Sequence, residues 1–178
     1  IFLGGERGRS GNHVVGVGSK LNWGFGGANN NKKDAAIPIR GELITKIPNF
    51  FPNNGINPYA RKGHNSKNHL RKKEAFVEFM FDDNYCIDIS PEGTQGDYYN
   101  SFSSYPSKST IGIYLRNRLG LDDDAFIHEN DLINYGRDFL TLEKIAEGQY
   151  IVDFSKLEKP RFLGIDPNKN YYCPDCPH

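Results

Sequence analysis

The sequence predicts a mainly β domain (an α+β fold) whose sheet is closed or nearly closed, with two short helices beside it. The chain has 178 residues, a length that suits one domain with a sizeable core. Hydrophobic residues make up 37% and include 12 Phe and 10 Tyr but a single Met, a composition that favours strands. The 19 Gly and 10 Pro predict many turns. Because the strand patterns are short and do not alternate with helices, we expect no βαβ units.

Six segments carry strand patterns. They are residues 13–17, 35–44, 74–81, 85–89, 139–145 and 149–154. Residues 74–81 alternate well, and an Asp-Asp-Asn turn joins them to the next strand, which predicts a hairpin. The last two segments form a second hairpin across a Glu-Gly turn. Pro38 suggests an edge strand or a bulge, and the apolar pattern around Cys86 predicts a buried thiol.

Two segments have helical patterns. Residues 107–119 place apolar side chains at helical spacing, and Ser107 or Ser109 is suited to cap the first turn. The glycine that follows is expected to end this helix in the left-handed conformation. Residues 129–135 form a shorter helix, which Gly136 closes in the same way.

Charge is unevenly distributed along the chain. Residues 1–73 hold 13 Lys and Arg against 3 Asp and Glu, so their formal charge is +10, and residues 74–178 carry −10. This split indicates binding of a polyanion by one part of the chain, or pairing between the two halves. Arg116 and Arg118 are open to two interpretations in the same way: contact with phosphates, or a structural salt bridge to the acidic turn 122–124.

Four motifs resemble one known family. They are Leu21-Asn22-Trp23-Gly24 followed by Asp34-Ala35-Ala36-Ile37-Pro38-Ile39, then residues 111–121, residues 131–137, and Tyr150-Ile151-Val152-Asp153-Phe154. In this order they resemble the C-terminal domain of NgoFVII-type restriction endonucleases, over roughly residues 13 to 156. The stretch Arg116-Asn117-Arg118-Leu119-Gly120-Leu121 is the most specific of the motifs.

The resemblance implies a B3-like pseudobarrel: seven strands in an open barrel, two helices, and two arms that read bases of double-stranded DNA in the major groove. It implies a type II-like restriction endonuclease, a cytoplasmic prokaryotic hydrolase of a restriction-modification system. Its phospholipase D-like nuclease domain would precede this fragment, and an ATPase subunit could act with it. Residues 1–12 would then be a linker, 13–160 the DNA-binding domain, and 161–178 a tail. The length of the basic stretch 61–73 and the Cys/His-containing tail depart from the family pattern.

The expected N-arm, residues 20–34, is rich in asparagine, glycine and lysine. Asparagine amides suit base edges, lysines suit phosphates or guanine, and the glycines allow close approach of the backbone. The alternative is a plain surface loop. Trp23 is interpreted as an anchor for the root of the arm rather than as a base contact. The candidate DNA-binding residues are Lys20, Asn22, Trp23, Asn29, Asn30, Asn31, Lys32, Lys33 and Asp34.

The expected C-arm, residues 90–108, is polar and aromatic. Carboxylates belong in a DNA interface only where they face base donors, chiefly the cytosine amino group, so its acidic residues are either readers or lie off the interface. The candidates are Ser90, Glu92, Gln95, Asp97, Tyr98, Asn100 and Lys108. The basic stretch 61–73 is suited to phosphate contacts that set affinity without reading sequence. The residues expected to make them are Arg61, Lys62 and Lys67.

No catalytic residues and no cofactor are expected in this fragment. The chain has no His-x-Lys pair, no phosphate-binding loop and no dinucleotide fingerprint. One alternative is a small metal-dependent nuclease that uses His64, His69 and Asp82; another is a protein-interaction module with a basic face. Three possible zinc ligands lie near the C-terminus, one fewer than a structural zinc requires, so no metal is expected there. These are Cys173, Cys176 and His178.

Overall fold

The computed structural model describes residues 1–4, 15–16, 19–27, 30–55, 77–93 and 98–171. In this part of the chain six strands form one sheet in the order β1-β4-β3-β2-β6-β5. The strands are β1 (Ile37–Pro38), β2 (Val77–Phe81), β3 (Cys86–Glu92), β4 (Ser101–Ser104), β5 (Thr141–Ala146) and β6 (Gln149–Asp153). The α-helices are α1 (Gly41–Lys46), α2 (Ser109–Leu119) and α3 (Glu129–Tyr135), and the 3-10 helices are η1 (Lys20–Phe25) and η2 (Pro52–Gly55).

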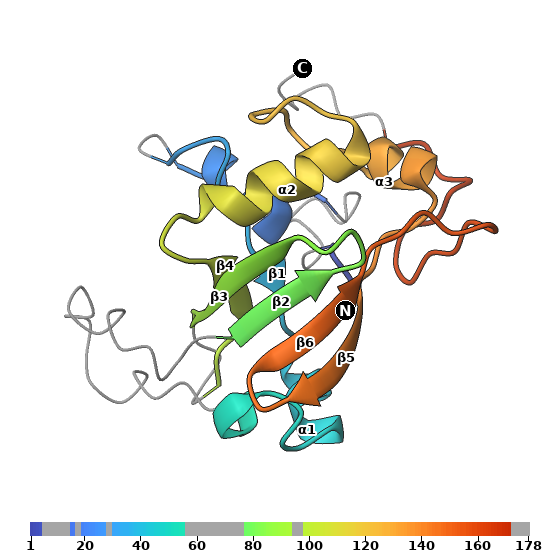
Figure 1. The fold of residues 1–178 in the computed structure, drawn as a ribbon. Helices are drawn as coiled ribbons and strands as arrows, with labels where there is room; N and C mark the ends of the chain where they lie inside the picture. The colour runs from blue at the N-terminus through green and yellow to red at the C-terminus, as the bar shows by residue number, and fades with distance from the viewer. Residues whose placement is uncertain (5–14, 17–18, 28–29, 56–76, 94–97, 172–178) are drawn as a thin grey trace.

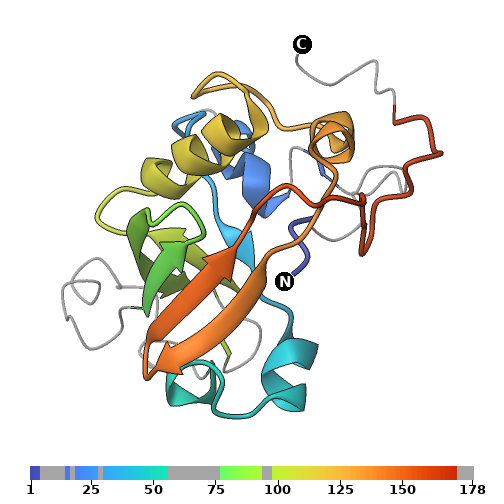
Figure 2. The ribbon, with the colours of Figure 1, turned by 45° about the vertical axis from the view of Figure 1, so that its right-hand side comes forward.

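The sheet is a curled half-barrel. Its neighbours are antiparallel except at the centre, where β2 pairs with β6 in parallel through partners such as Phe79 and Tyr150. Figures 1 and 2 show α2 across one end of the curled sheet and α1 with η2 near the other. The expected mainly β, B3-like architecture is therefore confirmed, whereas the described residues hold six strands and the expected seven are not confirmed.

Aromatic side chains fill the inside of the half-barrel. Phe79 lies fully buried on β2, and its ring centroid is 5.5 Å from that of Phe102 and 5.9 Å from that of Tyr150. Phe51, which directly precedes η2, lies edge-on to Phe102, with the ring centroids 5.1 Å apart. Such pairs add about 0.5–1.5 kcal/mol each beyond the area they bury. The Phe- and Tyr-rich composition thus reflects a core that strands build.

Several elements agree with the sequence prediction. The hairpins β2–β3 and β5–β6 are present, and α3 spans the predicted residues. Gly120 and Gly136 end α2 and α3 with φ of 75° and 91°, the left-handed conformation expected of them. At the start of α2 the cap is Lys108, without a side-chain cap, while the Ser109 N–H donates to Ser107 Oγ at 3.3 Å.

Two local predictions are wrong. The strand predicted over 35–44 shrinks to two residues because Pro38 lacks an N–H, and after Arg40 the chain turns into α1. Cys86 is exposed, since β3 alternates and this residue falls on the outer side of the strand. Of the strand expected over 13–17, residues 13, 14 and 17 lie outside the described residues, and residues 15–16 are not part of a strand.

Segments at both ends of the chain pack on the sheet. Leu3, Ile165 and Tyr171 are buried in the core, although residues 1–12 and 161–178 were interpreted as linker and tail. Asp138, also fully buried, accepts hydrogen bonds from the N–H groups of residues 163–165 at 2.7–2.9 Å. None of the helices among the described residues combines the length and the apolar composition that crossing a membrane requires.

Candidate nucleic-acid interface

The root of the N-arm is a tight backbone closure. The Gly24 N–H donates to Asp34 O at 3.1 Å, and the Asp34 N–H donates to Asn31 O at 2.8 Å. A Cβ on Gly24 would lie 1.9 Å from Asn31 O, so only glycine fits where the two sides of the arm meet. The arm therefore projects from a closed base, next to the N-terminal half of α2 in Figure 1.

Arg116 of α2 holds the returning side of the arm. Its side chain is fully buried and donates to the carbonyl oxygens of Lys32 at 3.1 Å and Lys33 at 3.2 Å, and to Ala125 O at 2.6 Å. Burial lowers the pKa of Arg116, and nearby carboxylates such as Asp124 oppose that shift. Neither interpretation from sequence holds, because this buried arginine binds backbone oxygens and forms no ion pair with the acidic turn among the contacts of the described residues.

The close packing of α2 on the arm also depends on Gly112. A Cβ at this position would lie 1.9 Å from Lys33 O. The isolated glycine in a helical pattern was a signal of close backbone approach that the sequence analysis did not use. Arg116 itself carried no local signal, since its acceptors come from distant residues.

Asn22 is part of the scaffold. It is fully buried, its Nδ2 donates to Ile127 O at 2.8 Å, and its Oδ1 accepts from the Ile127 N–H at 3.0 Å. Both ends of the amide are thus used by the protein, which removes Asn22 from the groups available to DNA.

Asn30 and Asn31, the other described asparagines of the N-arm, hold the arm in shape but keep free hydrogen-bonding capacity. Asn31 Nδ2 donates to Ser109 Oγ at 3.1 Å, and its Oδ1 accepts from the Lys33 N–H at 3.1 Å. Asn30 Nδ2 donates to Trp23 O at 3.2 Å. Both side chains are exposed, and each amide has a hydrogen or lone pair that these bonds do not use. Asn29 lies outside the described residues.

Asp34 and Lys33 make contacts within the protein. Asp34 Oδ1 accepts from Ser109 Oγ at 2.6 Å, which places a carboxylate at the N-terminus of α2, where the helix dipole favours it. Lys33 Nζ lies 3.5 Å from Asp123 Oδ2. Lys32 is exposed, and its ammonium lies 5.8 Å from the centroid of Phe25.

The two arms meet at a four-residue cluster, which we call the arm junction: Lys20, Trp23, Glu92 and Lys108. Lys108 Nζ lies 2.9 Å from Glu92 Oε2, and Lys20 Nζ lies 4.3 Å from the Trp23 ring centroid. Lys108 Nζ is 5.7 Å from the same centroid. Burial lowers the pKa of Lys20; Glu92 opposes that shift and Lys108 adds to it.

Trp23 is 40% exposed, which does not fit an anchor. The packing at the root of the arm comes from Phe25 instead, whose ring meets Phe126 edge-on at 5.1 Å. The indole thus remains accessible at the surface, beside two ammonium groups.

Much of the predicted C-arm belongs to the sheet. Ser90 is buried within β3, and β4 occupies residues 101–104, so the part between the strands is 93–100. Asn100 Oδ1 accepts from Ser101 Oγ at 3.2 Å. A Cβ on Gly93 would lie 2.1 Å from the same oxygen. Tyr98 is half-buried. Gln95 and Asp97 lie outside the described residues, as do Arg61, Lys62 and Lys67.

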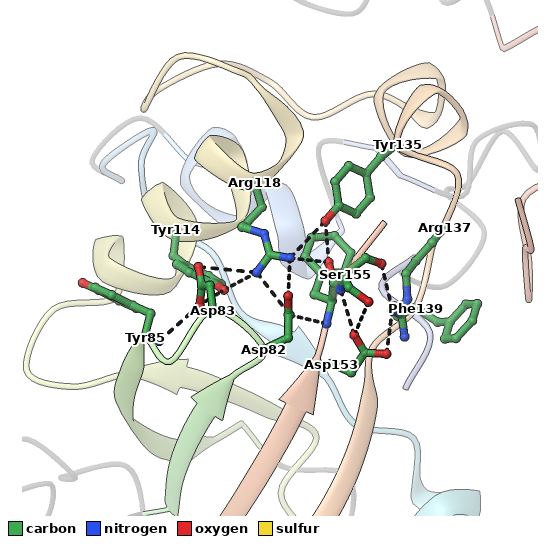
Figure 3. Close-up of polar contacts among 11 residues, drawn as sticks. Asp82, Asp83, Tyr85, Tyr114, Arg118, Tyr135, Arg137, Phe139, Asp153 and Ser155 are labelled. Atoms are coloured by element: carbon green, nitrogen blue, oxygen red, sulfur yellow. Dashed lines mark hydrogen bonds and ion pairs between the residues drawn. The ribbon is translucent and has the colours of Figure 1, made fainter. Parts of the chain in front are cut away.

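A second polar network lies at the opposite end of α2 and is drawn in Figure 3. Arg118 donates to both carboxylate oxygens of Asp82 at 3.1 and 2.8 Å, to Tyr114 Oη at 2.6 Å and to Phe154 O at 2.7 Å. Burial alone would raise the pKa of Asp82, but the bonds from Arg118 and the Phe154 N–H lower it overall. Arg118 does form a salt bridge, but its partner is Asp82, so the predicted partner, the acidic turn 122–124, is wrong.

This network bears on the alternative of a metal-dependent nuclease. Asp82 binds Arg118 and the Phe154 N–H, so it acts as a structural carboxylate. Its two proposed companions, His64 and His69, lie outside the described residues. Within the described ranges no three His, Cys, Asp or Glu side chains gather as metal ligands would. Cys173, Cys176 and His178 also lie outside these ranges.

A family model for the NgoFVII C-terminal B3-like DNA-binding domain matches residues 8–146. The chain belongs to this family. The match covers both arms and ends in β5. Because the family is one of DNA-binding domains, this B3-like domain is a DNA-binding domain rather than a catalytic one. A search of curated proteins found no match for it.

Proposed function

We propose that this B3-like domain recognises a specific sequence of double-stranded DNA by placing its two arms in the major groove. The observation that carries the proposal is the arm junction, where Lys20 and Trp23 of the N-arm meet Glu92 and Lys108 of the C-arm. Donors and an acceptor lie side by side there on two different segments. Base pairs are distinguished in the major groove by such groups.

The anchoring of the N-arm supports base reading. A loop that reads bases binds more tightly when it is ordered before DNA arrives, because ordering it on binding lowers affinity. Arg116 and Asn22 hold the root of the arm through bonds to the backbone. The exposed groups of the arm are then left for DNA, namely Trp23, Asn30, Asn31 and Lys32.

Charge supports contact with the phosphates. Lys32 and Lys33 are adjacent on the returning side of the N-arm, and Lys20 and Lys108 lie together at the arm junction. Arg61, Lys62 and Lys67 extend the proposed phosphate contacts. Such contacts set affinity for all duplexes and make binding fall with salt.

We further propose that the domain delivers a restriction endonuclease to its target. The family name supports this context. A phospholipase D-like nuclease domain of the same polypeptide would cut the DNA, and an ATPase subunit is a proposed partner. Cleavage of plasmid by the isolated domain with Mg²⁺ would contradict this division of labour.

Binding of fluorescent duplexes, measured by anisotropy at several salt concentrations, tests the proposed function. We expect duplexes to compete better than single strands, and one sequence enriched from random duplexes to compete best. Lys32→Ala should weaken binding to every duplex and reduce the salt slope by about one. Lys46→Ala is the matched control, because Lys46 is exposed on α1 and pairs with Glu42 at 2.5 Å. Equal binding of all duplexes by the wild type would refute sequence recognition.

A further inference from the structure

The Glu92–Lys108 ion pair of the arm junction joins two separate elements of the fold. Glu92 ends β3 and Lys108 precedes α2, so two separate elements hold the pair. The side chains are 20% and 41% exposed, and Nζ and Oε2 are 2.9 Å apart. An acceptor and a donor therefore lie next to each other at the surface, fixed from both sides.

We propose that Glu92 and Lys108 together read one C·G base pair, a step that rests on the proposed function. Glu92 accepts from the cytosine amino group, and Lys108 donates to guanine O6 and N7. In the Watson–Crick pair, cytosine N4 donates to guanine O6 over about 2.9 Å. The ion pair presents an acceptor beside a donor at that same spacing, so it is the complement of this base-pair edge.

An A·T pair fits the ion pair less well. Adenine N6 and thymine O4 also place a donor beside an acceptor, but the thymine methyl group lies next to O4, where the ammonium would sit. Guanine instead offers a second acceptor, N7, within reach of the same ammonium. The preferred partner is therefore C·G, with cytosine on the side of Glu92.

The neighbours of the pair make a carboxylate tolerable near phosphates. Lys20 interacts electrostatically with both Glu92 and Lys108, so two ammonium groups surround one carboxylate. Phosphates thus meet a net positive cluster.

Selection from random duplexes, with the wild type and with Glu92→Gln, Glu92→Ala and Lys108→Ala, tests this proposal. The wild-type motif should contain a C·G pair whose preference drops about tenfold or more in Glu92→Ala, with the other positions unchanged. Glu92→Gln should shift that position towards A·T, because glutamine pairs with adenine through two hydrogen bonds. Replacing the guanine by 7-deazaguanine should weaken the wild type and leave Lys108→Ala unaffected.

Glu147→Gln is the matched control. It removes a carboxylate from another ion pair, Lys144–Glu147 at 2.6 Å on the β5–β6 hairpin, and should select the wild-type motif. Thermal melting of each variant shows that it is folded. A folded Glu92→Ala that keeps every preference, or loses them all equally, would overturn the reading role while leaving DNA binding intact. A wild type that enriches no motif would overturn both this inference and the proposed function.

Discussion

Two arginines lie two residues apart on α2 and hold different regions of the domain. Arg116 donates to backbone carbonyls and holds the N-arm, whereas Arg118 donates largely to side chains near the ends of β2 and β6, above all Asp82. The acceptors of Arg116 do not depend on which side chains the arm carries. Substitutions of the exposed arm side chains should therefore leave this anchor in place, whereas the Arg118 network depends on particular side chains such as Asp82.

The two arginines also differ in the charge of their acceptors. The partners of Arg116 are neutral dipoles, so its bonds do not titrate. Arg118 has a pKa raised above its ordinary value by Asp82 and two tyrosine hydroxyls, although burial opposes the shift. The Arg118 network contains a carboxylate bonded directly to the arginine, so it should respond to acid more strongly than the bonds of Arg116 to backbone oxygens.

The largest expected effect is that of Arg116→Met. The change leaves the partly buried carbonyls of Lys32, Lys33 and Ala125 without this donor, so we expect a loss of about 3–5 kcal/mol of unfolding free energy. DNA affinity of the remaining folded protein should also fall, because the arm is released. Urea unfolding and anisotropy at low temperature measure the two effects. An affinity equal to wild type would show that the arm does not need this anchor.

Arg118→Met should cost somewhat less stability, about 2–3 kcal/mol, because the side chain is 17% exposed and water replaces part of the network. In contrast to the previous variant, the folded protein should bind its preferred duplex as the wild type does. Anisotropy on protein that circular dichroism shows to be folded makes the comparison. Reduced affinity at full folding would mean that the Arg118 network and the arm held by Arg116 are coupled.

Gly24→Ala should act on the arm alone. The new Cβ would collide with Asn31 O, so the root must open, with a stability cost of about 1–3 kcal/mol and weaker DNA binding. Gly16→Ala is the control, since a Cβ there meets no atom within 4 Å. Equal affinity of both variants would show that closure of the root is not needed for binding.

The smallest expected effect concerns acid. The pKa of Asp82 in the folded protein lies below its ordinary value of 3.8, so ionised Asp82 stabilises the fold above that pH. This contribution should be lost as the pH falls below 3.8 towards the folded pKa. Urea unfolding from pH 7 to pH 2 should therefore show a smaller acid-dependent loss in Asp82→Asn than in the wild type. Parallel curves for the two proteins would exclude this carboxylate as a source.

Local signals in the sequence were sufficient for part of the fold. Two hairpins, α2 and α3 followed from alternation, helical spacing and turn residues, and Gly120 and Gly136 have the φ values expected of them. Segment 35–44 failed because its apolar residues suit a strand as well as a short helix. The parallel pairing of β2 with β6 joins residues about seventy positions apart, and neither segment has a local pattern that predicts it.

The sequence by itself determined the β-rich class, the ends of the main helices and the family, because these depend on residues close together in the chain. The tertiary structure decided which polar side chains face solvent. Asn22 and Asn31 share one residue type, yet one is buried against Ile127 and the other is exposed beside Ser109. Burial and hydrogen-bond partners come from segments that meet only when the chain folds, so composition alone could not separate scaffold from surface.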